Sequence, residues 1–135
     1  MARSINNTPL EEDEMKAFHQ WLQINGIPHT HIPTEIGGST PAMKARALKM
    51  KKMGTSKGFP DLLVFIPIYG NTDEPDAYQP LAIEMKRQKG STTSKEQKEW
   101  LKILEMAGIP SAVCKGAEKA IEFVEQTIRE IGGEE

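Results

Sequence analysis

Two carboxylates and a lysine, spread over two short apolar segments, are the residues best suited to chemistry. Glu84 and Lys86 are two residues apart in one segment, and Asp61 opens the apolar run 61–66. Residues two apart on a strand project from the same face, about 6.6 Å from one another. If the two strands are neighbours, all three side chains converge. Adjacent carboxylates repel each other and lose solvation, so the pattern predicts a divalent cation, and oxygen ligands favour Mg²⁺, with Mn²⁺ as a substitute.

The lysine has a different task from the acids. Beside carboxylates, the Lys86 ammonium can orient an attacking water and stabilise charge that develops on a phosphate. The alternative is structural: an isolated Glu-x-Lys pair is usually the charged rim of an edge strand, and Asp61 can simply cap a turn. The Pro60-Asp61 pair at the head of an apolar strand and an acid on the first helix both favour the catalytic interpretation.

That acid is Glu11. A helix is expected from Thr8, as its cap, with Pro9 in the first helical position, to about Asn25, and Gly26 suits its C-terminal cap. Residues 11–14 are all acidic and would lie at the positive end of the helix dipole. At 100° per residue, Glu11 falls on one stripe with the apolar side chains of residues 15, 18 and 22. A carboxylate is therefore in line with the buried face.

The remaining elements predict an α/β fold in one domain, residues 1–135. Apolar runs predict strands at about 27–33, 61–66, 81–86 and 109–114, and residues 70–80 indicate an exposed, turn-rich connection. Helices are expected at about 40–53, from Ser94 to about 107, and at 117–131. The final strand–helix–strand unit implies a parallel crossover, and the two middle strands can pair as a hairpin. The result is a mixed sheet with helices on its faces.

A basic helical insert, about residues 40–57, stands out from a chain whose net charge is −2. No acidic residue occurs from Ile36 to Pro60. Its six basic residues are Lys44, Arg46, Lys49, Lys51, Lys52 and Lys57. Charge segregated in this way indicates that a polyanion binds one face, whereas the alternative is a solvated surface helix. Because no aromatic residue lies among these six, contacts to the backbone of duplex or branched DNA are favoured over stacking on bases.

The order and spacing of these motifs resemble the PD-(D/E)xK nuclease superfamily and, within it, the VRR-NUC family of virus-type replication-repair nucleases. The matching segments are KGFPDL at 57–62, IEMKR at 83–87, SKEQ at 94–97 followed by Trp100, and Gly108 ahead of the last strand. With the acidic first helix they cover about residues 10–125. The resemblance implies a restriction-endonuclease-like core, αβββαβ plus a C-terminal helix, and metal-dependent cleavage of DNA phosphodiesters. It also implies that Asp61, Glu84 and the backbone carbonyl of Met85 bind the metal and that Lys86 is catalytic.

Two helices carry the rest of the site that the resemblance implies. The glutamate of the family's first helix corresponds best to Glu11, with Glu14 second, and Met15 replaces the glutamine that often follows one turn later. Gln97 corresponds to a family glutamine that would face the metal site and act in catalysis, although it also fits a capping box with Ser94. Arg87 joins the basic residues expected to contact DNA.

The function implied is that of a Mg²⁺-dependent DNA endonuclease. Compact stand-alone members of this type, typical of phage genomes, tend to act as homodimers on branched DNA such as four-way (Holliday) junctions. Two alternatives stay open: a non-catalytic nucleic-acid-binding module with the same fold, and a nuclease that acts on RNA. His29 and His31 share a strand face and would need a third ligand from elsewhere to bind metal. One cysteine, no apolar leader and no membrane-length apolar run favour a cytoplasmic protein without membrane contact.

Overall fold

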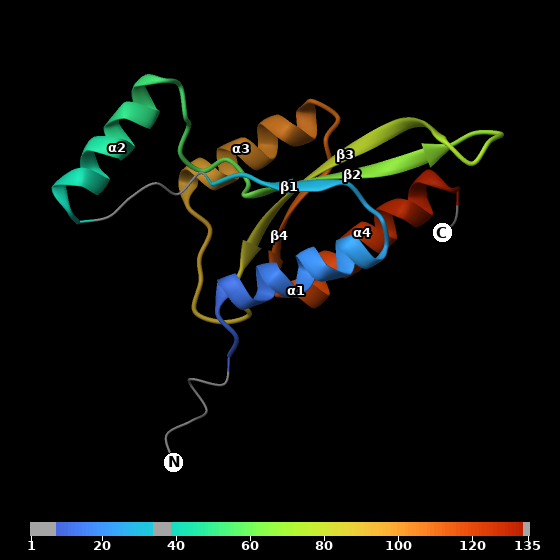
Figure 1. Ribbon diagram of the computed structural model, residues 1–135, viewed down its shortest axis with the longest axis horizontal. Coiled ribbons are helices and arrows are strands. Elements are labelled where there is room, and N and C mark those ends of the chain that lie inside the picture. Colours follow the sequence, from blue (N-terminus) through green and yellow to red (C-terminus); the bar gives the residue numbers. More distant parts are fainter. Residues whose placement is uncertain (1–7, 34–38, 134–135) are drawn as a thin grey trace, which may run out of the picture.

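A mixed four-stranded sheet runs through the middle of the molecule, with helices on its two faces (Figure 1). The computed structural model describes residues 8–33 and 39–133. Within them the elements are α1 (Glu11–Ile24), β1 (His29–His31), α2 (Pro41–Lys52), β2 (Leu62–Tyr69), β3 (Pro75–Lys86), α3 (Lys95–Met106), β4 (Ser111–Lys115) and α4 (Ala117–Ile131). The predicted order of helices and strands and the predicted α/β class are both confirmed.

The strands lie in the order β1-β2-β3-β4. β2 pairs antiparallel with β1 and with β3, so the two middle strands form the expected hairpin. β3 pairs parallel with β4, and the chain crosses between them through α3, as the sequence predicts. Alternate residues of each strand therefore point to opposite faces of the sheet.

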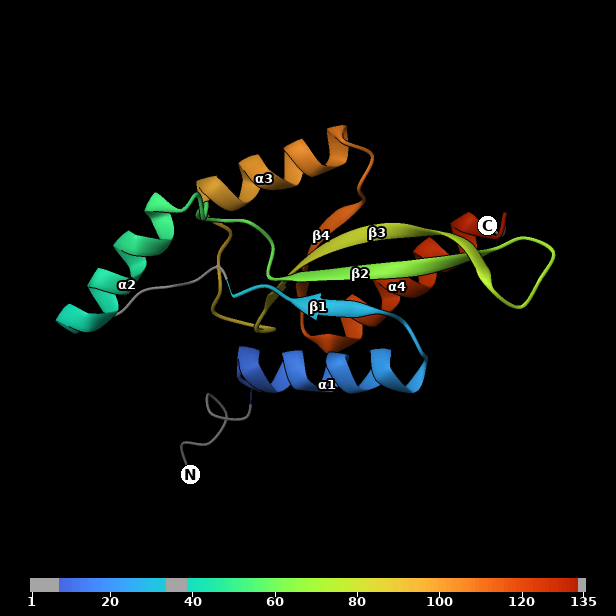
Figure 2. The ribbon, with the colours of Figure 1, turned by 45° about the horizontal axis from the view of Figure 1, so that its top comes forward.

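One face of the sheet carries the apolar core. Leu62 and Val64 of β2 and Leu81 and Ile83 of β3 alternate onto this face and are buried against α1 and α4. Figure 2 shows α1 and α4 on this side and α3 on the other. The stripe predicted on α1 is buried at Phe18 and at residue 22. Each such side chain contributes roughly 1.5–3 kcal/mol on burial, so this face holds the molecule together. No helix among the described residues is long and apolar enough to cross a membrane.

The start of α1 differs from the prediction. The helix begins at Glu11 with Leu10 in the cap position, and no side chain caps it, so the expected cap by Thr8 is wrong. The Arg87 guanidinium donates hydrogen bonds to the carbonyls of Thr8 and Pro9, at 2.9 and 3.1 Å. These bonds hold both residues ahead of the helix and outside it.

The third strand is longer than expected. Residues 75–80, predicted as part of an exposed connection, belong to β3 and pair with the far end of β2 up to Tyr69. On its other side, β3 pairs with β4 from Ala82 onward. Proline is tolerated where one edge of a strand is unpaired, which explains how Pro75 and Pro80 fit into a strand.

Helix α2 is formed by local signals alone. Thr40 caps it, its side chain accepting a hydrogen bond of 3.1 Å from the Met43 N–H, and Pro41 occupies the first turn. None of its residues is buried. In Figures 1 and 2 the helix projects from the body of the molecule. The predicted basic helix is confirmed, and it stands away from the apolar core.

Candidate metal centre

The register of β2 against β3 brings the two strand carboxylates together. Leu62 pairs with Ile83, and continuing this antiparallel register by one residue places Asp61 opposite Glu84. Both are buried, with 8% and 3% of their surfaces exposed. The Asp61 Oδ1 atom accepts a hydrogen bond of 3.1 Å from the Met85 N–H. The predicted convergence of these two acids therefore follows from the sheet itself.

A third carboxylate reaches the same place from α1. Glu11, Asp61 and Glu84 each offer a carboxylate oxygen, and these oxygens lie within 4.8 Å of one another. The three residues come from the first turn of α1, the residue before β2 and the carboxyl end of β3. A single cation could contact all three, so this group is the candidate metal centre.

Lys86 adds one positive charge to the three negative ones. Its Nζ atom lies 3.6 Å from Glu84 Oε2, and both side chains are almost completely removed from water. The formal net charge of these four side chains is thus two negative charges. In this largely buried site, repulsion between the carboxylates and the loss of their solvation are costly. Carboxylate oxygens at this spacing suit a hard divalent ion such as Mg²⁺ or Mn²⁺. The residues present therefore fit the predicted ion.

Gly58 explains why the KGFPDL motif needs a glycine. Its φ is +88°, and a Cβ atom there would lie 2.6 Å from the backbone carbon of Glu96 and 2.7 Å from the backbone nitrogen of Gln97. The entry to β2 is thus pressed against the first turn of α3. Next to it, the rings of Phe59 and Trp100 meet edge to face with their centroids 5.0 Å apart. These contacts fix the direction from which Asp61 enters the sheet.

The capping-box interpretation of Gln97 is confirmed. Its backbone N–H donates to the Ser94 hydroxyl at 3.1 Å, and its side-chain oxygen accepts from the Ser94 N–H at 2.9 Å. The buried Gln97 side chain therefore fixes the start of α3, against which Gly58 packs. Its catalytic role stays a prediction.

Glu14 and Arg87, both predicted as site residues, form hydrogen bonds with groups other than the three acids. Glu14 lies outside the group of three acids; its carboxylate accepts hydrogen bonds from the Ala117 N–H and from Gln88. Arg87, predicted to contact DNA, donates its guanidinium hydrogens to the carbonyls ahead of α1. The geometry therefore favours Glu11 over Glu14 as the ligand from α1.

Exposed basic side chains lie on α2 and around the strand ends. All six predicted DNA contacts of the insert, Lys44, Arg46, Lys49, Lys51, Lys52 and Lys57, are exposed. The structure adds Lys115, an exposed residue whose parallel register places it beside Lys86. The predicted strand 109–114 ends one residue short of Lys115, and the observed register between β3 and β4 is what places Lys115 beside Lys86.

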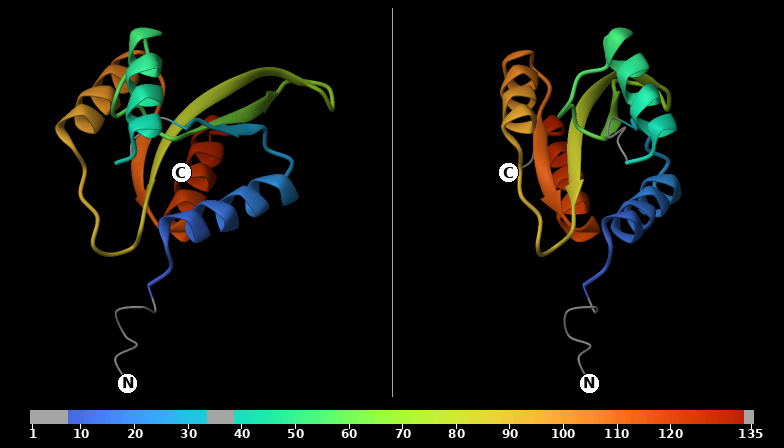
Figure 3. Two further views of the ribbon diagram at one scale, coloured as in Figure 1. Left: turned by 60° about the vertical axis from the view of Figure 1, so that its left-hand side comes forward. Right: turned by 90° about the vertical axis from the view of Figure 1, so that its left-hand side faces the viewer.

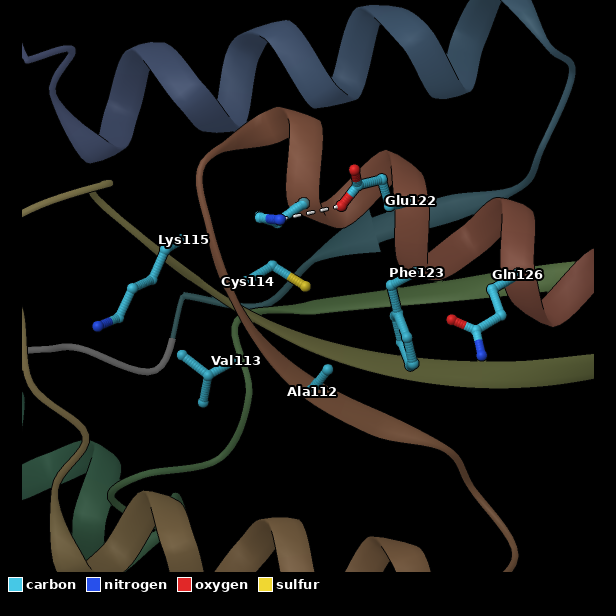
Figure 4. Close-up of a pocket in the computed structure, with 8 residues that line it drawn as sticks. Ala112, Val113, Cys114, Lys115, Glu122, Phe123 and Gln126 are labelled. Carbon is cyan, nitrogen blue, oxygen red and sulfur yellow. Dashed lines mark ion pairs between the residues drawn. The ribbon is translucent and has the colours of Figure 1, made fainter.

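A groove of about 460 Å³ between β4 and α4 is lined by residues such as Val113 and Phe123, and the Lys119–Glu122 ion pair of 3.4 Å lies at its side (Figure 4). Burial, and then the charge of Asp61, raise the pKa of the Cys114 thiol in its wall to about 12.

His29 and His31 lie two residues apart on β1, so the predicted shared strand face is confirmed. His29 Nε2 lies 2.6 Å from Nδ1 of His19 on α1, and His31 belongs to no group of three metal-ligating side chains among the described residues.

A helix-flanked mixed sheet with acids and a lysine at adjacent strand ends defines a restriction-endonuclease-like α/β protein. The family model of the VRR-NUC domain matches residues 5–118, and the chain belongs to the VRR-NUC family, a nuclease-type family. Among solved structures, a "VRR_NUC domain protein" superposes with a TM-score of 0.62 at 23% sequence identity over 91% of each chain, which shows the same fold. No curated protein matches the chain.

Proposed function

We propose that the protein is a metal-dependent DNA endonuclease that hydrolyses phosphodiester bonds. The observation that carries this proposal is the meeting of Glu11, Asp61 and Glu84 within 4.8 Å, with Lys86 beside them, in a chain of the VRR-NUC family. A surface that only binds nucleic acid gains nothing from carboxylates facing phosphate. The acidic group is therefore better explained by catalysis than by binding.

In this proposal Glu11, Asp61 and Glu84, with the backbone carbonyl of Met85, hold Mg²⁺ or Mn²⁺. When bound, the ion supplies a Lewis acid that polarises the phosphate and balances the negative charge of its ligands. The Met85 N–H, which donates to Asp61 Oδ1, orients that carboxylate. The sheet thus presents its acids in a fixed arrangement before substrate arrives.

In this proposal Lys86 orients the attacking water and stabilises the charge that develops on the phosphate. Its ammonium, 3.6 Å from Glu84 Oε2, can hold an attacking water and donate to a phosphate oxygen as negative charge develops there. The water oxygen then bonds to phosphorus as the water gives up a proton, the bond from phosphorus to one ester oxygen breaks, and that oxygen takes up a proton and leaves as a hydroxyl. Gln97 can assist from the start of α3.

DNA is held mainly by exposed cations. The lysines of α2, with Lys57 and Lys115, are placed to contact phosphates, while Arg87 supports the site from within. Such contacts read the backbone and not the base sequence. We propose branched DNA such as four-way junctions as the substrate and a homodimer as the active form, because two sites related by a two-fold axis suit paired nicks.

The test uses purified protein with linear, flap and four-way-junction DNA, with Mg²⁺ or with EDTA, and an RNA duplex in parallel. We expect Mg²⁺-dependent nicks in DNA, concentrated near the branch point. Asp61→Asn and Lys86→Ala should each lower the cleavage rate by at least about 10²–10³-fold while leaving DNA binding and thermal stability near those of the wild type. The change Asp13→Asn, at an exposed acid of α1, is the matched control and should cleave normally.

Undiminished nicking by either site variant would refute the catalytic assignment. Salt-sensitive binding without any Mg²⁺-dependent product would identify a binding module instead. Preferential digestion of RNA would show that the protein is a ribonuclease. Equal cleavage of linear and branched DNA would contradict the proposed selectivity for branched DNA.

A further inference from the structure

Glu14 is the buried acid among the four acidic residues that begin α1. It lies one turn after Glu11 on α1 and exposes 6% of its surface, whereas Glu12 and Asp13 are exposed to water. A buried carboxylate is costly unless hydrogen bonds satisfy it. Its partners therefore indicate why the chain keeps an acid at this position.

Both oxygens of Glu14 are engaged by other elements. Oε1 accepts a hydrogen bond of 3.0 Å from the N–H of Ala117, the first residue of α4, and Oε2 accepts one of 2.8 Å from Gln88 Nε2. The residue that caps α4, Gly116, has no side chain with which to bind this helix end. Glu14 supplies the missing acceptor from α1, and the helix dipole of α4 favours its negative charge.

Gly116 makes room for this contact. Its φ is +98°, and a Cβ atom there would lie 3.2 Å from Glu14 Oε2 and 3.0 Å from Gln88 Cγ. Its own N–H donates a hydrogen bond of 2.9 Å to the carbonyl of Lys86. One short stretch of backbone therefore joins the strand that carries Glu84 and Lys86 to the carboxylate of Glu14.

The start of α1 has no side-chain cap of its own. Residues of other elements hold it in place. Arg87 donates hydrogen bonds to the carbonyls of Thr8 and Pro9, and Glu14, one turn into the helix, accepts one from the start of α4. In both views of Figure 3 the first turn of α1 lies beside the first turn of α4. Glu11 belongs to this same turn, so its place in the acidic group depends on these contacts.

We infer that Glu14, together with Gln88 and Gly116, is a positioning residue that fixes the first turn of α1 and thereby sets Glu11 against Asp61 and Glu84. The inference rests on the proposed metal-dependent function. Groups that orient metal ligands without touching the metal commonly change metal affinity by about 10–100-fold. Glu14 thus raises the affinity of the site for its metal ion without contacting the ion.

Calorimetric titration of the purified protein with Mn²⁺ tests this assignment, with the Mn²⁺ dependence of cleavage as a second readout. Glu14→Ala should raise the dissociation constant for Mn²⁺ by about 10-fold and raise the Mn²⁺ concentration for half-maximal cleavage to match. The rate at saturating Mn²⁺ should stay within about twofold of the wild type, because Glu11 still binds once metal is abundant. Glu12→Gln, an exposed neighbour, should leave both values unchanged.

The conservative change Glu14→Gln separates positioning from ligation. A glutamine oxygen can still accept from the Ala117 N–H, and the exposed Gln88 amide can turn to accept from the new amide, so near-normal Mn²⁺ affinity is expected. Glu11→Gln, by contrast, should lose Mn²⁺ binding. If Glu14→Gln loses it as well, Glu14 is itself a ligand and the inference is wrong.

Two further outcomes are distinguishable. If Glu14 supports only folding, Glu14→Ala lowers the melting temperature and the active fraction without changing the dissociation constant for Mn²⁺, which overturns the inference while the nuclease proposal stands. If the wild-type protein neither binds Mn²⁺ nor cleaves with it, the proposed function fails first, and the inference falls with it.

Discussion

Two charged regions of the molecule, the end of the β2–β3 pair and helix α2, differ in burial. Asp61, Glu84 and Lys86 are buried where the two strands meet. Helix α2 carries five lysine and arginine side chains and has no buried residue. Charges removed from water interact strongly over short distances, whereas exposed charges are screened by salt. The first region is therefore suited to chemistry and the second to salt-sensitive binding.

The two regions are also held in place by different means. Asp61 and Glu84 depend on the register of two strands, on the Met85 N–H and on the packing of Gly58 against α3. Helix α2 is stabilised by the Thr40 cap and by lysines in its last turn, whose positive charges interact favourably with the negative end of the helix dipole. A change that displaces the backbone of the packed region should thus affect folding and cleavage together, and a change on α2 should affect binding alone.

The largest effect is expected from Gly58→Ala. The new methyl group would overlap the backbone of α3 and would sit at a positive φ, so the entry to β2 and with it Asp61 must move. Gly54 provides the control, because it has a φ of +99° at the end of α2 but a Cβ atom added there would meet nothing within 4 Å. Gly54→Ala should cost about 1–2 kcal/mol from backbone strain, and Gly58→Ala clearly more, measured by urea unfolding. Cleavage should be lost only at position 58; equal behaviour of the two variants would contradict this difference.

A smaller effect, confined to binding, is expected on α2. The triple change Lys44→Gln, Lys49→Gln and Lys52→Gln should reduce DNA affinity and lower the slope of log K against log salt by about 2–3. The melting temperature and the rate at saturating DNA should not change, because these side chains are exposed.

The matched control for α2 removes three exposed lysines elsewhere, at positions 16, 102 and 119. It changes the net charge of the protein by the same amount. If this control weakens DNA binding equally, overall charge and not α2 is responsible.

The smallest effect concerns Cys114. Burial raises its pKa to about 12, with a contribution from the charge of Asp61, so the native thiol should react slowly with iodoacetamide at pH 8 and rapidly after unfolding. Asp61→Asn should lower this pKa and speed the native reaction, whereas the α2 triple variant should not.

The raised pKa of Cys114 also predicts how the stability of the protein depends on pH. The unfolded thiol ionises near pH 9, so the stability that the neutral thiol contributes is complete below pH 9 and is lost between pH 9 and about 12. Cys114→Ala should flatten that part of the pH–stability curve, and an unchanged curve would contradict the raised pKa.

Local sequence signals predicted most elements well. The capping box at Ser94 and the apolar period of the last helix need only neighbouring residues, and α3 and α4 lie where expected. The misplaced features are those decided by distant partners. Arg87, 78 residues away in the chain from Pro9, binds the carbonyls of the segment ahead of α1, and the pairing with β2 extends β3 into the predicted loop.

The candidate site divides in the same way. That Glu84 and Lys86 share a face follows from the two-residue period of a strand, so their spacing in the sequence is enough. The position of Asp61 beside Glu84 and Lys86 depends on the register between β2 and β3. The packing of α1 decides that Glu11 lies in the acidic group while Glu14 contacts α4. Backbone periodicity is a local property of the chain, whereas contacts between elements arise only when the whole core has packed.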